Sequence, residues 1–199
     1  KFCLRLWKHL YKQTTLSIIP YHLDKRLSSY TKDYIYDPQM WDMHCTEYYS
    51  HSEVDIEYAK RQVSTNKKPL VLFLGKATHR KGLKEFIEFV EANRNEFQFI
   101  LAGMIPSENS LSIQQLKKLG VKIIDGYLEE SKFLGFYEIA DFIWCYYKPI
   151  YDQTSGVFGR AIQCGVIPIV RSDSMISRIA KNPNIACVEL DFASNNQHL

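Results

Sequence analysis

The sequence lacks the cysteine patterns of a metal centre or a disulfide framework. Its five cysteines are odd in number, form no C-x-x-C pair and mostly lie in apolar runs, which is typical of reduced packing residues in a cytoplasmic protein. His44, Cys45 and His51 lie close together, but their spacing matches no zinc-finger pattern and no fourth ligand is evident. We therefore expect no metal ion and no disulfide.

Long apolar segments are missing as well. No run approaches the roughly 20 apolar residues that a bilayer span requires, and we recognise no signal peptide, so we expect a cytoplasmic protein. Residues 1–12 combine apolar side chains on one side of a predicted helix with interspersed basic residues. We interpret this helix as packing against a partner domain, and peripheral contact with the inner face of the membrane is the alternative.

Strong charge of one sign is also absent. The formal net charge is +3 and the basic residues are dispersed, so we expect no nucleic-acid partner. The glycine-rich phosphate motifs G-x-x-x-x-G-K-S/T and G-x-G-x-x-G do not occur. What the chain does contain is 199 residues with 46% hydrophobic content, enough to bury a core without a disulfide or metal.

From Pro69 onward, short apolar runs alternate with amphipathic stretches. The runs span residues 69–75, 97–103, 121–126, 141–147, 166–172 and 185–190. Continuous rather than alternating hydrophobicity is typical of parallel strands that are covered on both faces. Between the runs, apolar residues recur at helical spacing. This alternation predicts an α/β fold with a Rossmann-like, doubly wound parallel sheet.

The first 65 residues do not share this rhythm. They predict a short strand, an extended connector and a helix that leads into the sheet, at residues 16–22, 33–41 and 53–64 respectively. We interpret residues 1–65 as the tail of a preceding, amino-terminal domain plus a linker, and residues 66–199 as the Rossmann-like domain. Because the first residue is not methionine, we expect the chain to be a piece of a longer protein.

The loop after the first strand of this domain concentrates positive charge. Gly75 lets the backbone turn, and the residues that follow include Lys76, His79, Arg80 and Lys81. Ligands of open α/β sheets bind beyond the carboxyl ends of the strands. Cations at that edge, close to the start of a helix, make an anion site because their charge adds to that of the unpaired amides. The alternative is a solvated basic loop.

The loop after the fourth strand contains a second candidate half-site. It leads into a helix predicted at residues 157–164 and includes Asp152, Thr154, Ser155 and Gly156. Thr154 or Ser155 is the expected N-cap, and Gly156 would let a phosphate approach the amides of Gly156 and Val157. The alternative is that the stretch only caps a helix. Two half-sites at one sheet edge favour a diphosphate ligand.

The third strand ends in a further candidate binding element. Gly126 and Tyr127 could line a flat slot for a nucleobase, with the tyrosine ring covering the face of the base. An ordinary strand-to-helix turn is the alternative.

Four segments in this order resemble the C-terminal, nucleotide-sugar-binding domain of GT-B fold retaining glycosyltransferases of the family-four type. They are G-K-x-x-x-R-K-G at residues 75–82, FILAG at 99–103, VKIIDGYLEESKFLGFYEIADF at 121–142 and DQTSGVFGRAIQCGVIPIV at 152–170. The resemblance implies the C-terminal half of such an enzyme. It also implies a nucleoside-diphosphate sugar as donor, no metal or other cofactor, and an acceptor bound by the missing amino-terminal domain. A saccharide or lipid-linked acceptor in polysaccharide biosynthesis is expected on this basis.

The resemblance also assigns roles to single residues. Lys76 and Lys81 match the basic pair that holds the donor diphosphate, and Asp152 matches the first carboxylate of the last motif, which contacts the transferred sugar. These three are the expected catalytic residues. The expected donor-binding residues are Gly75, Lys76, Arg80, Lys81, Gly126, Tyr127, Thr154, Ser155, Gly156, Val157 and Arg160.

Arg160 departs from the family pattern, which has a second glutamate at this position. That glutamate accepts hydrogen bonds from the ribose, whereas an arginine has only donors. Three explanations remain open. Other groups read the ribose, or Arg160 supplements the diphosphate site from the first turn of its helix, or Arg160 pairs with a carboxylate in a structural role.

Two functions compete with a glycosyltransferase donor domain. One is a non-catalytic module, resembling the transferases, that binds a nucleotide or phosphate. The other is a sugar-nucleotide epimerase of the same architecture, which would need acid and base carboxylates facing the sugar, and only Asp152 is evident.

Overall fold

The computed structural model describes Cys3, Leu6 and residues 16–17, 24–35, 53–64, 67–181 and 185–192. Apart from Cys3 and Leu6, the helix expected at residues 1–12 lies outside the described residues. The group formed by His44, Cys45 and His51 lies outside them as well.

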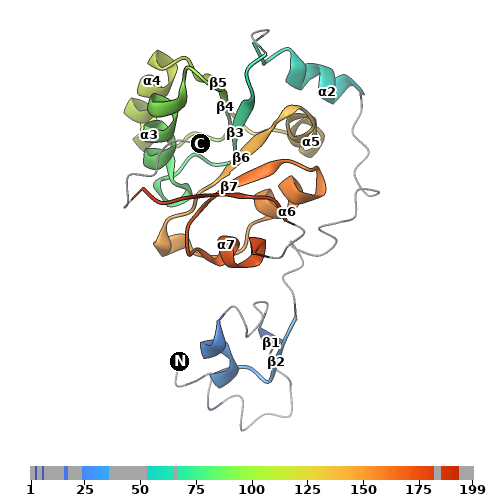
Figure 1. Cartoon of the computed structure of the whole chain (residues 1–199), viewed down its shortest axis with the longest axis vertical. Helices are drawn as coiled ribbons and strands as arrows, with labels where there is room; N and C mark the ends of the chain where they lie inside the picture. The colour runs from blue at the N-terminus through green and yellow to red at the C-terminus, as the bar shows by residue number, and fades with distance from the viewer. Residues whose placement is uncertain are drawn as a thin grey trace.

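Six parallel strands form the central sheet in the spatial order β5-β4-β3-β6-β7-β8 (Figure 1). They are β3 (Leu70–Leu74), β4 (Gln98–Gly103), β5 (Lys122–Asp125), β6 (Phe142–Cys145), β7 (Ile167–Arg171) and β8 (Val188–Leu190). Each predicted apolar run contains one of these strands. Counted along the chain from β3, the order is third, second, first, fourth, fifth and sixth, which is the Rossmann order. The predicted α/β fold with a doubly wound sheet is confirmed.

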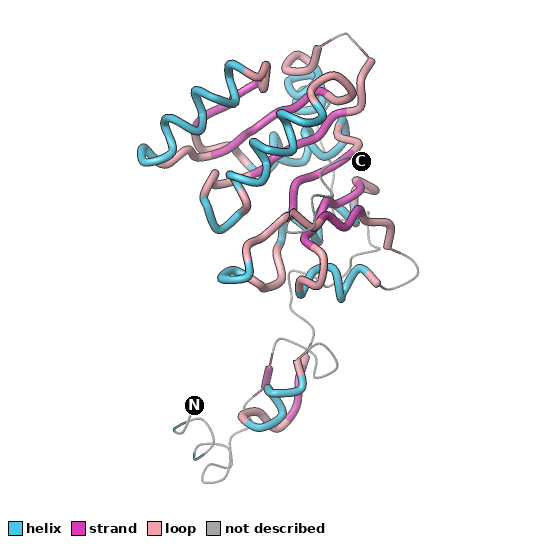
Figure 2. The backbone as a smooth tube through the Cα atoms, turned by 60° about the vertical axis from the view of Figure 1, so that its left-hand side comes forward, coloured by secondary structure: helices cyan, strands magenta, loops and turns pink. Residues whose placement is uncertain are grey.

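Helices cover both faces of the sheet (Figures 1 and 2). One face packs against α3 (Leu83–Asn93) and α4 (Ser110–Lys118). The other packs against α5 (Glu130–Ile139), α6 (Gly156–Gln163) and α7 (Met175–Ala180). Alternate residues of β3 enter the two cores, with Leu72 facing α5 and α6 while Phe73 faces α3. Every residue of β3 is buried, which explains why the sequence of this strand is apolar without alternation.

Short elements connect and precede this core. The 3-10 turns η3 (His79–Lys81), η4 (Ser107–Asn109) and η5 (Pro149–Tyr151) follow β3, β4 and β6. In the amino-terminal part, β1 (Leu16–Ser17) pairs in parallel with β2 (Asp33–Tyr34), and η1 (Lys25–Ser29) lies between them in the chain.

Helix α2 (Glu53–Lys60) packs into the same core as the sheet. The Ala59 side chain is fully buried, and the Tyr58 and Phe136 rings meet edge to face at 6.1 Å. The helix predicted at residues 53–64 ends earlier, at Lys60, because the next residues form i→i−3 turn bonds such as Gln62 N–H to Ala59 O. The division of the chain at residue 65 stays a prediction.

The described cysteines are free thiols, namely Cys3, Cys145, Cys164 and Cys187. Cys145 is buried, and burial raises the pKa of its thiol to about 12, as expected of a packing residue. Cys3 is exposed and does not fit that interpretation. None of the helices that the structure describes has the length and apolar character needed to cross a lipid bilayer.

Candidate functional site

The order of the strands reverses between β3 and β6, so the chain leaves these two neighbours toward opposite halves of the sheet. In open α/β sheets, ligands bind in the crevice at this reversal, outside the carboxyl ends of the strands. The loops that follow β3 and β6, residues 75–82 and 146–155, flank that position. They contain the two half-sites predicted from the sequence, so the fold brings both to one edge.

Direct contacts join these two loops. The Lys148 N–H donates to Arg80 O at 3.0 Å, and the Arg80 guanidinium lies 4.8 Å from the centre of the Tyr151 ring. The indole Nε1–H of Trp144, in β6, donates to Lys81 O at 3.2 Å. The basic loop is therefore held in place by the neighbouring strand and loop.

Glycines allow the backbones at this edge to approach closely. Gly75 and Gly103 both have positive φ, at 94° and 137°. A Cβ atom on Gly103 would lie 2.3 Å from Gly75 O, well inside contact distance. The Gly75 N–H donates to Ala102 O at 2.9 Å. Only glycine fits at position 103 without moving the loop that starts at Gly75.

Lys81 places its ammonium group above Gly75. A Cβ atom on Gly75 would lie 3.0 Å from Lys81 Nζ, and no carboxylate of the described residues pairs with this side chain. Burial lowers the pKa of Lys81, and the nearby Arg80 charge lowers it further, while Cys145 opposes the shift. A partly buried cation without a partner would gain from a bound anion.

Three other cations near this edge are already paired. Lys148 pairs with the buried carboxylate of Glu85, Arg171 with Asp152 and Arg160 with Glu130. By contrast, Lys76 and His79 are exposed and have no ion pair within the described part of the chain. Within the described residues, the loop after β3 therefore carries basic side chains that are not paired with carboxylates.

Helix α6 starts at Gly156 and is capped by Ser155 rather than Thr154. The Ser155 Oγ accepts from the Val157 N–H at 3.2 Å and lies 2.7 Å from the Tyr147 hydroxyl oxygen. The Val157 amide, expected to face a phosphate, is therefore already bonded. Of the two amides predicted to face a phosphate, only the Gly156 N–H remains a candidate donor. The helix spans residues 156–163 instead of the predicted 157–164.

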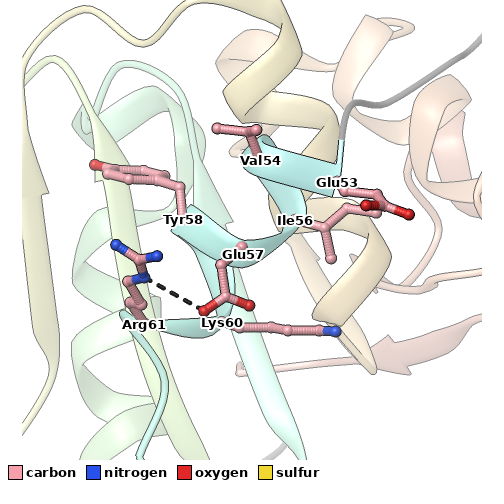
Figure 3. A pocket seen from close by; sticks show the side chains of 7 residues that line it. All are labelled: Glu53, Val54, Ile56, Glu57, Tyr58, Lys60 and Arg61. Atoms are coloured by element: carbon pink, nitrogen blue, oxygen red, sulfur yellow. Dashed lines mark hydrogen bonds and ion pairs between the residues drawn. The ribbon is translucent and has the colours of Figure 1, made fainter.

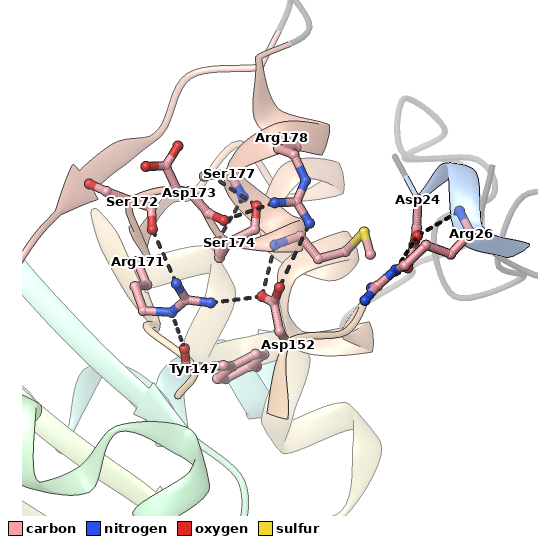
Figure 4. Close-up of polar contacts among 11 residues, drawn as sticks. Asp24, Arg26, Tyr147, Asp152, Arg171, Ser172, Asp173, Ser174, Ser177 and Arg178 are labelled. Carbon is pink, nitrogen blue, oxygen red and sulfur yellow. Dashed lines mark hydrogen bonds and ion pairs between the residues drawn. The ribbon is translucent and has the colours of Figure 1, made fainter. Parts of the chain in front are cut away.

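Asp152 is held by groups of β7 and α7 (Figure 4). Its Oδ1 accepts from Arg171 Nη2 at 2.9 Å and from the Met175 N–H at 2.8 Å, and its Oδ2 lies 3.7 Å from Arg178 Nη2. These partners lie 19 or more residues later in the chain, and no local pattern indicates them. The expected contact of Asp152 with a sugar would use the oxygen that is less engaged.

Arg160 is the fifth residue of α6 and lies in its second turn, not in the first turn as expected. Its Nη2 donates to Glu130 Oε1 of α5 at 2.7 Å. The carboxylate partner of the third explanation therefore exists. Sequence reasoning gave Glu130 no role, because it precedes Arg160 by 30 residues.

The loop after β5 also lies at this edge. Gly126 has φ of 134° and donates its N–H to Gly103 O at 3.2 Å, which ties the loop to the end of β4. Tyr127 is 86% exposed, whereas the next residue, Leu128, is buried. The Tyr127 ring is thus open to solvent, and its role in a base slot stays a prediction.

Two hollows of the described part lie away from this edge. One, of about 640 Å³, lies along α2 and is lined by Glu53, Val54, Ile56, Glu57, Tyr58, Lys60 and Arg61 (Figure 3). The other, of about 450 Å³, lies at the amino ends of β4 and β5. Neither includes the loops at the strand reversal, so we place the site by topology and charge. Within the described ranges, no group of three His, Cys, Asp or Glu side chains is arranged to hold a metal ion.

No protein-family model matches the sequence, and no curated protein is significantly similar to it. Solved structures do share its fold. Anabaena HepE in complex with UDP matches with a TM-score of 0.68 at 14% identity, over 94% of this chain and 52% of HepE. The C-terminal domain of LpcC, a glycosyl transferase group 1 family protein from Francisella tularensis, matches with a TM-score of 0.53 at 15% identity, over 75% of this chain and 81% of that domain.

A third similar structure is a UDP-forming α,α-trehalose-phosphate synthase from Burkholderia xenovorans in complex with glucose-6-phosphate. Its TM-score is 0.52 at 12% identity, over 74% of this chain and 38% of the synthase. The chain thus spans about half the length of HepE and a smaller share of the synthase. At these identities the likeness concerns the fold alone. This chain has the α/β, Rossmann-like fold of the C-terminal domains of GT-B glycosyltransferases.

Proposed function

We propose that this chain is the donor-binding half of a glycosyltransferase, which transfers a sugar from a nucleoside-diphosphate sugar to an acceptor. The observation that carries the proposal is the partly buried Lys81 ammonium group above Gly75, which has no carboxylate partner among the described residues. It lies at the strand reversal, where this fold binds ligands. The anion in this proposal is the donor diphosphate, held between this loop and the start of α6.

The chemistry follows from the charge of the leaving group. As the bond between the sugar and the diphosphate breaks, negative charge grows on the phosphate oxygens. Fixed cations and helix-start amides stabilise that charge more in the transition state than in the ground state. In this chain, Lys81, Lys76, Arg80 and the Gly156 amide would have this role. Because Arg80 also lies over the Tyr151 ring, its guanidinium is already held near this position.

The comparisons support a nucleotide donor through the ligands of similar structures. HepE binds UDP in its crystal structure, and the Burkholderia synthase is a UDP-forming enzyme. A retaining mechanism, a saccharide or lipid-linked acceptor and a place in polysaccharide biosynthesis are parts of the proposal. So are the absence of a metal cofactor and an acceptor site on another domain.

Isothermal titration calorimetry with UDP, GDP and ADP tests the proposal. We expect at least one of them to bind with a sub-millimolar Kd. Lys81→Ala should weaken that binding by about 1.5–3 kcal/mol, the usual contribution of a hydrogen bond to a charged group. Lys84→Ala is the matched control, because Lys84 is exposed on α3 and pairs with Glu88 on the same helix. If none of the three nucleotides binds, the proposal is wrong.

A non-catalytic nucleotide-binding module is the second candidate. It is favoured by one observation, the engagement of Asp152 with Arg171 and the Met175 amide, which occupies the carboxylate expected to contact the sugar. Product analysis of the full-length protein with radiolabelled nucleotide sugars separates the two functions. A transferase releases labelled glycoside, a binding module leaves the donor unchanged, and an epimerase would instead convert the sugar while it remains attached to the nucleotide.

A further inference from the structure

A nucleotide bound at this edge would have to place its ribose between two parts of the site. The ribose connects the base to the phosphates, so it lies between the base slot at Gly126 and Tyr127 and the phosphate position at the start of α6. Helix α5 begins with Glu130, four residues after Gly126. The ion pair with Arg160 draws the Glu130 carboxylate toward α6. Glu130 thus follows the predicted base slot in the chain, and its carboxylate is bonded to the helix whose start is the predicted phosphate position.

The ion pair leaves most of the Glu130 carboxylate accessible. Of the two carboxylate oxygens of Glu130, Oε1 accepts from Arg160 Nη2 at 2.7 Å. The Glu130 side chain is 73% exposed, whereas the Arg160 side chain is 28% exposed. An ionised carboxylate accepts hydrogen bonds on both oxygens and donates none. Ribose hydroxyls can donate hydrogen bonds to such a carboxylate. The guanidinium of Arg160 has only donors and cannot accept them.

The neighbouring carboxylate is arranged differently. Glu129 precedes α5 and lies 3.5 Å from Lys132 Nζ, one turn along the same helix. Its side chain is 70% exposed, close to the value for Glu130. Glu129 is thus equal in charge and exposure but is tied to its own helix instead of to α6.

We propose that Glu130, oriented by Arg160, accepts hydrogen bonds from the ribose hydroxyls of the bound nucleoside diphosphate. The inference rests on the proposed function, because it needs a nucleotide at this edge. It also gives Arg160 a defined task. Arg160 is a positioning residue that holds the Glu130 carboxylate between the base and the phosphates.

The test compares two ligands that differ only in a hydroxyl. Calorimetry measures the tightest binder among UDP, GDP and ADP alongside its 2′-deoxy analogue, in the wild type, Glu130→Ala and Glu129→Ala. The ratio of the two Kd values cancels changes in phosphate attraction, since both ligands carry the same diphosphate. We expect the wild type and Glu129→Ala to prefer the ribose form by about tenfold or more, and Glu130→Ala to prefer it by less than about threefold.

Arg160→Ala should reduce the same ratio without weakening the binding of pyrophosphate, and Arg160→Lys should restore part of the preference. Thermal melting checks that each variant is folded, which we expect because the Glu130 side chain is 73% exposed and ion pairs open to solvent contribute little to stability. An unchanged ribose preference in Glu130→Ala would overturn the inference while leaving the proposed function intact. A loss of pyrophosphate binding in Arg160→Ala would make Arg160 a phosphate ligand and overturn its positioning role. Failure of all three nucleotides to bind the wild type would instead reject the proposed function.

Discussion

Lys81 shows how the needs of a ligand can oppose the stability of the empty protein. Burial lowers the pKa of Lys81 below its usual value of 10.5. Between the lowered value and 10.5, the unfolded chain binds more protons at this residue than the folded chain does. Stability therefore rises with pH across that window. The positive charge at Lys81 costs stability in the absence of a ligand, and a diphosphate would remove that cost.

Replacing Lys81 with methionine isolates this effect, because methionine keeps the length of the side chain and removes the charge. We expect the free energy of unfolding of the wild type to rise relative to Lys81→Met as the pH approaches 10.5. At neutral pH the methionine variant should be at least as stable as the wild type. Urea denaturation at a series of pH values measures the difference. A methionine variant that is clearly less stable at neutral pH would show that Lys81 stabilises the fold.

For single residues, the sequence indicated the basic side chains of the candidate site but not the carboxylates that pair with some of them. Lys76, Arg80 and Lys81 stand in one short loop, so a local pattern was enough to find them. The pair between Lys148 and Glu85 joins residues 63 apart in the sequence. Such a contact depends on how strands and helices pack, and neither spacing nor composition records it.

Hydrophobic patterns predicted where the strands lie but not where each strand ends. The run at residues 141–147 predicted β6, but the strand ends at Cys145, and Tyr146 and Tyr147 continue as a buried loop. Tyr146 stacks on Trp144 with ring centres 5.5 Å apart, and the Tyr147 hydroxyl contacts Ser155. An apolar run indicates that residues are buried. It does not indicate where a strand ends, because buried residues can continue beyond the last hydrogen bond of the strand.

Two glycines with positive φ allow a matched test of the close approach between β3 and β4. Gly103→Ala should destabilise the protein by about 3 kcal/mol or more, because it adds a clash with Gly75 O to a backbone conformation that favours glycine. Gly120→Ala should cost only about 1–2 kcal/mol, because Gly120 has φ of 88° but open space around its Cβ position. Chemical denaturation compares the two. If both substitutions lowered the free energy of unfolding equally, the contact between a Cβ atom at position 103 and Gly75 O would not destabilise the protein.

In the whole molecule, the contact between α2 and α5 joins the amino-terminal part of the chain to the sheet. A Cβ atom on Gly135 of α5 would lie 2.4 Å from Asp55 O of α2. Sequence reasoning assigned this helix to the tail of a preceding domain plus a linker, because the first 65 residues do not share the alternation of strands and helices that follows. Its close packing depends on Gly135, a glycine far along the chain, and no local sequence pattern can show such a contact.

Gly135→Ala tests whether α2 is held in this way. In an unobstructed helix this change stabilises by about 0.5–1 kcal/mol. Here we expect the opposite sign, together with faster hydrogen exchange at residues 53–60 and little change at residues 83–93. Hydrogen exchange with mass spectrometry measures both segments in one experiment. A stabilised variant with unchanged exchange would show that α2 does not rest on Gly135.

The same contact bears on how the protein is made. A ribosome completes α2 long before it completes α5, and at about 5–20 residues per second the delay between residues 60 and 139 is roughly 4–16 s. During that time the face of α2 that carries Tyr58 and Ala59 has no native partner. Nascent-chain chaperones that shield short apolar segments would therefore meet this helix early in synthesis, while the nucleotide edge of the sheet is still incomplete.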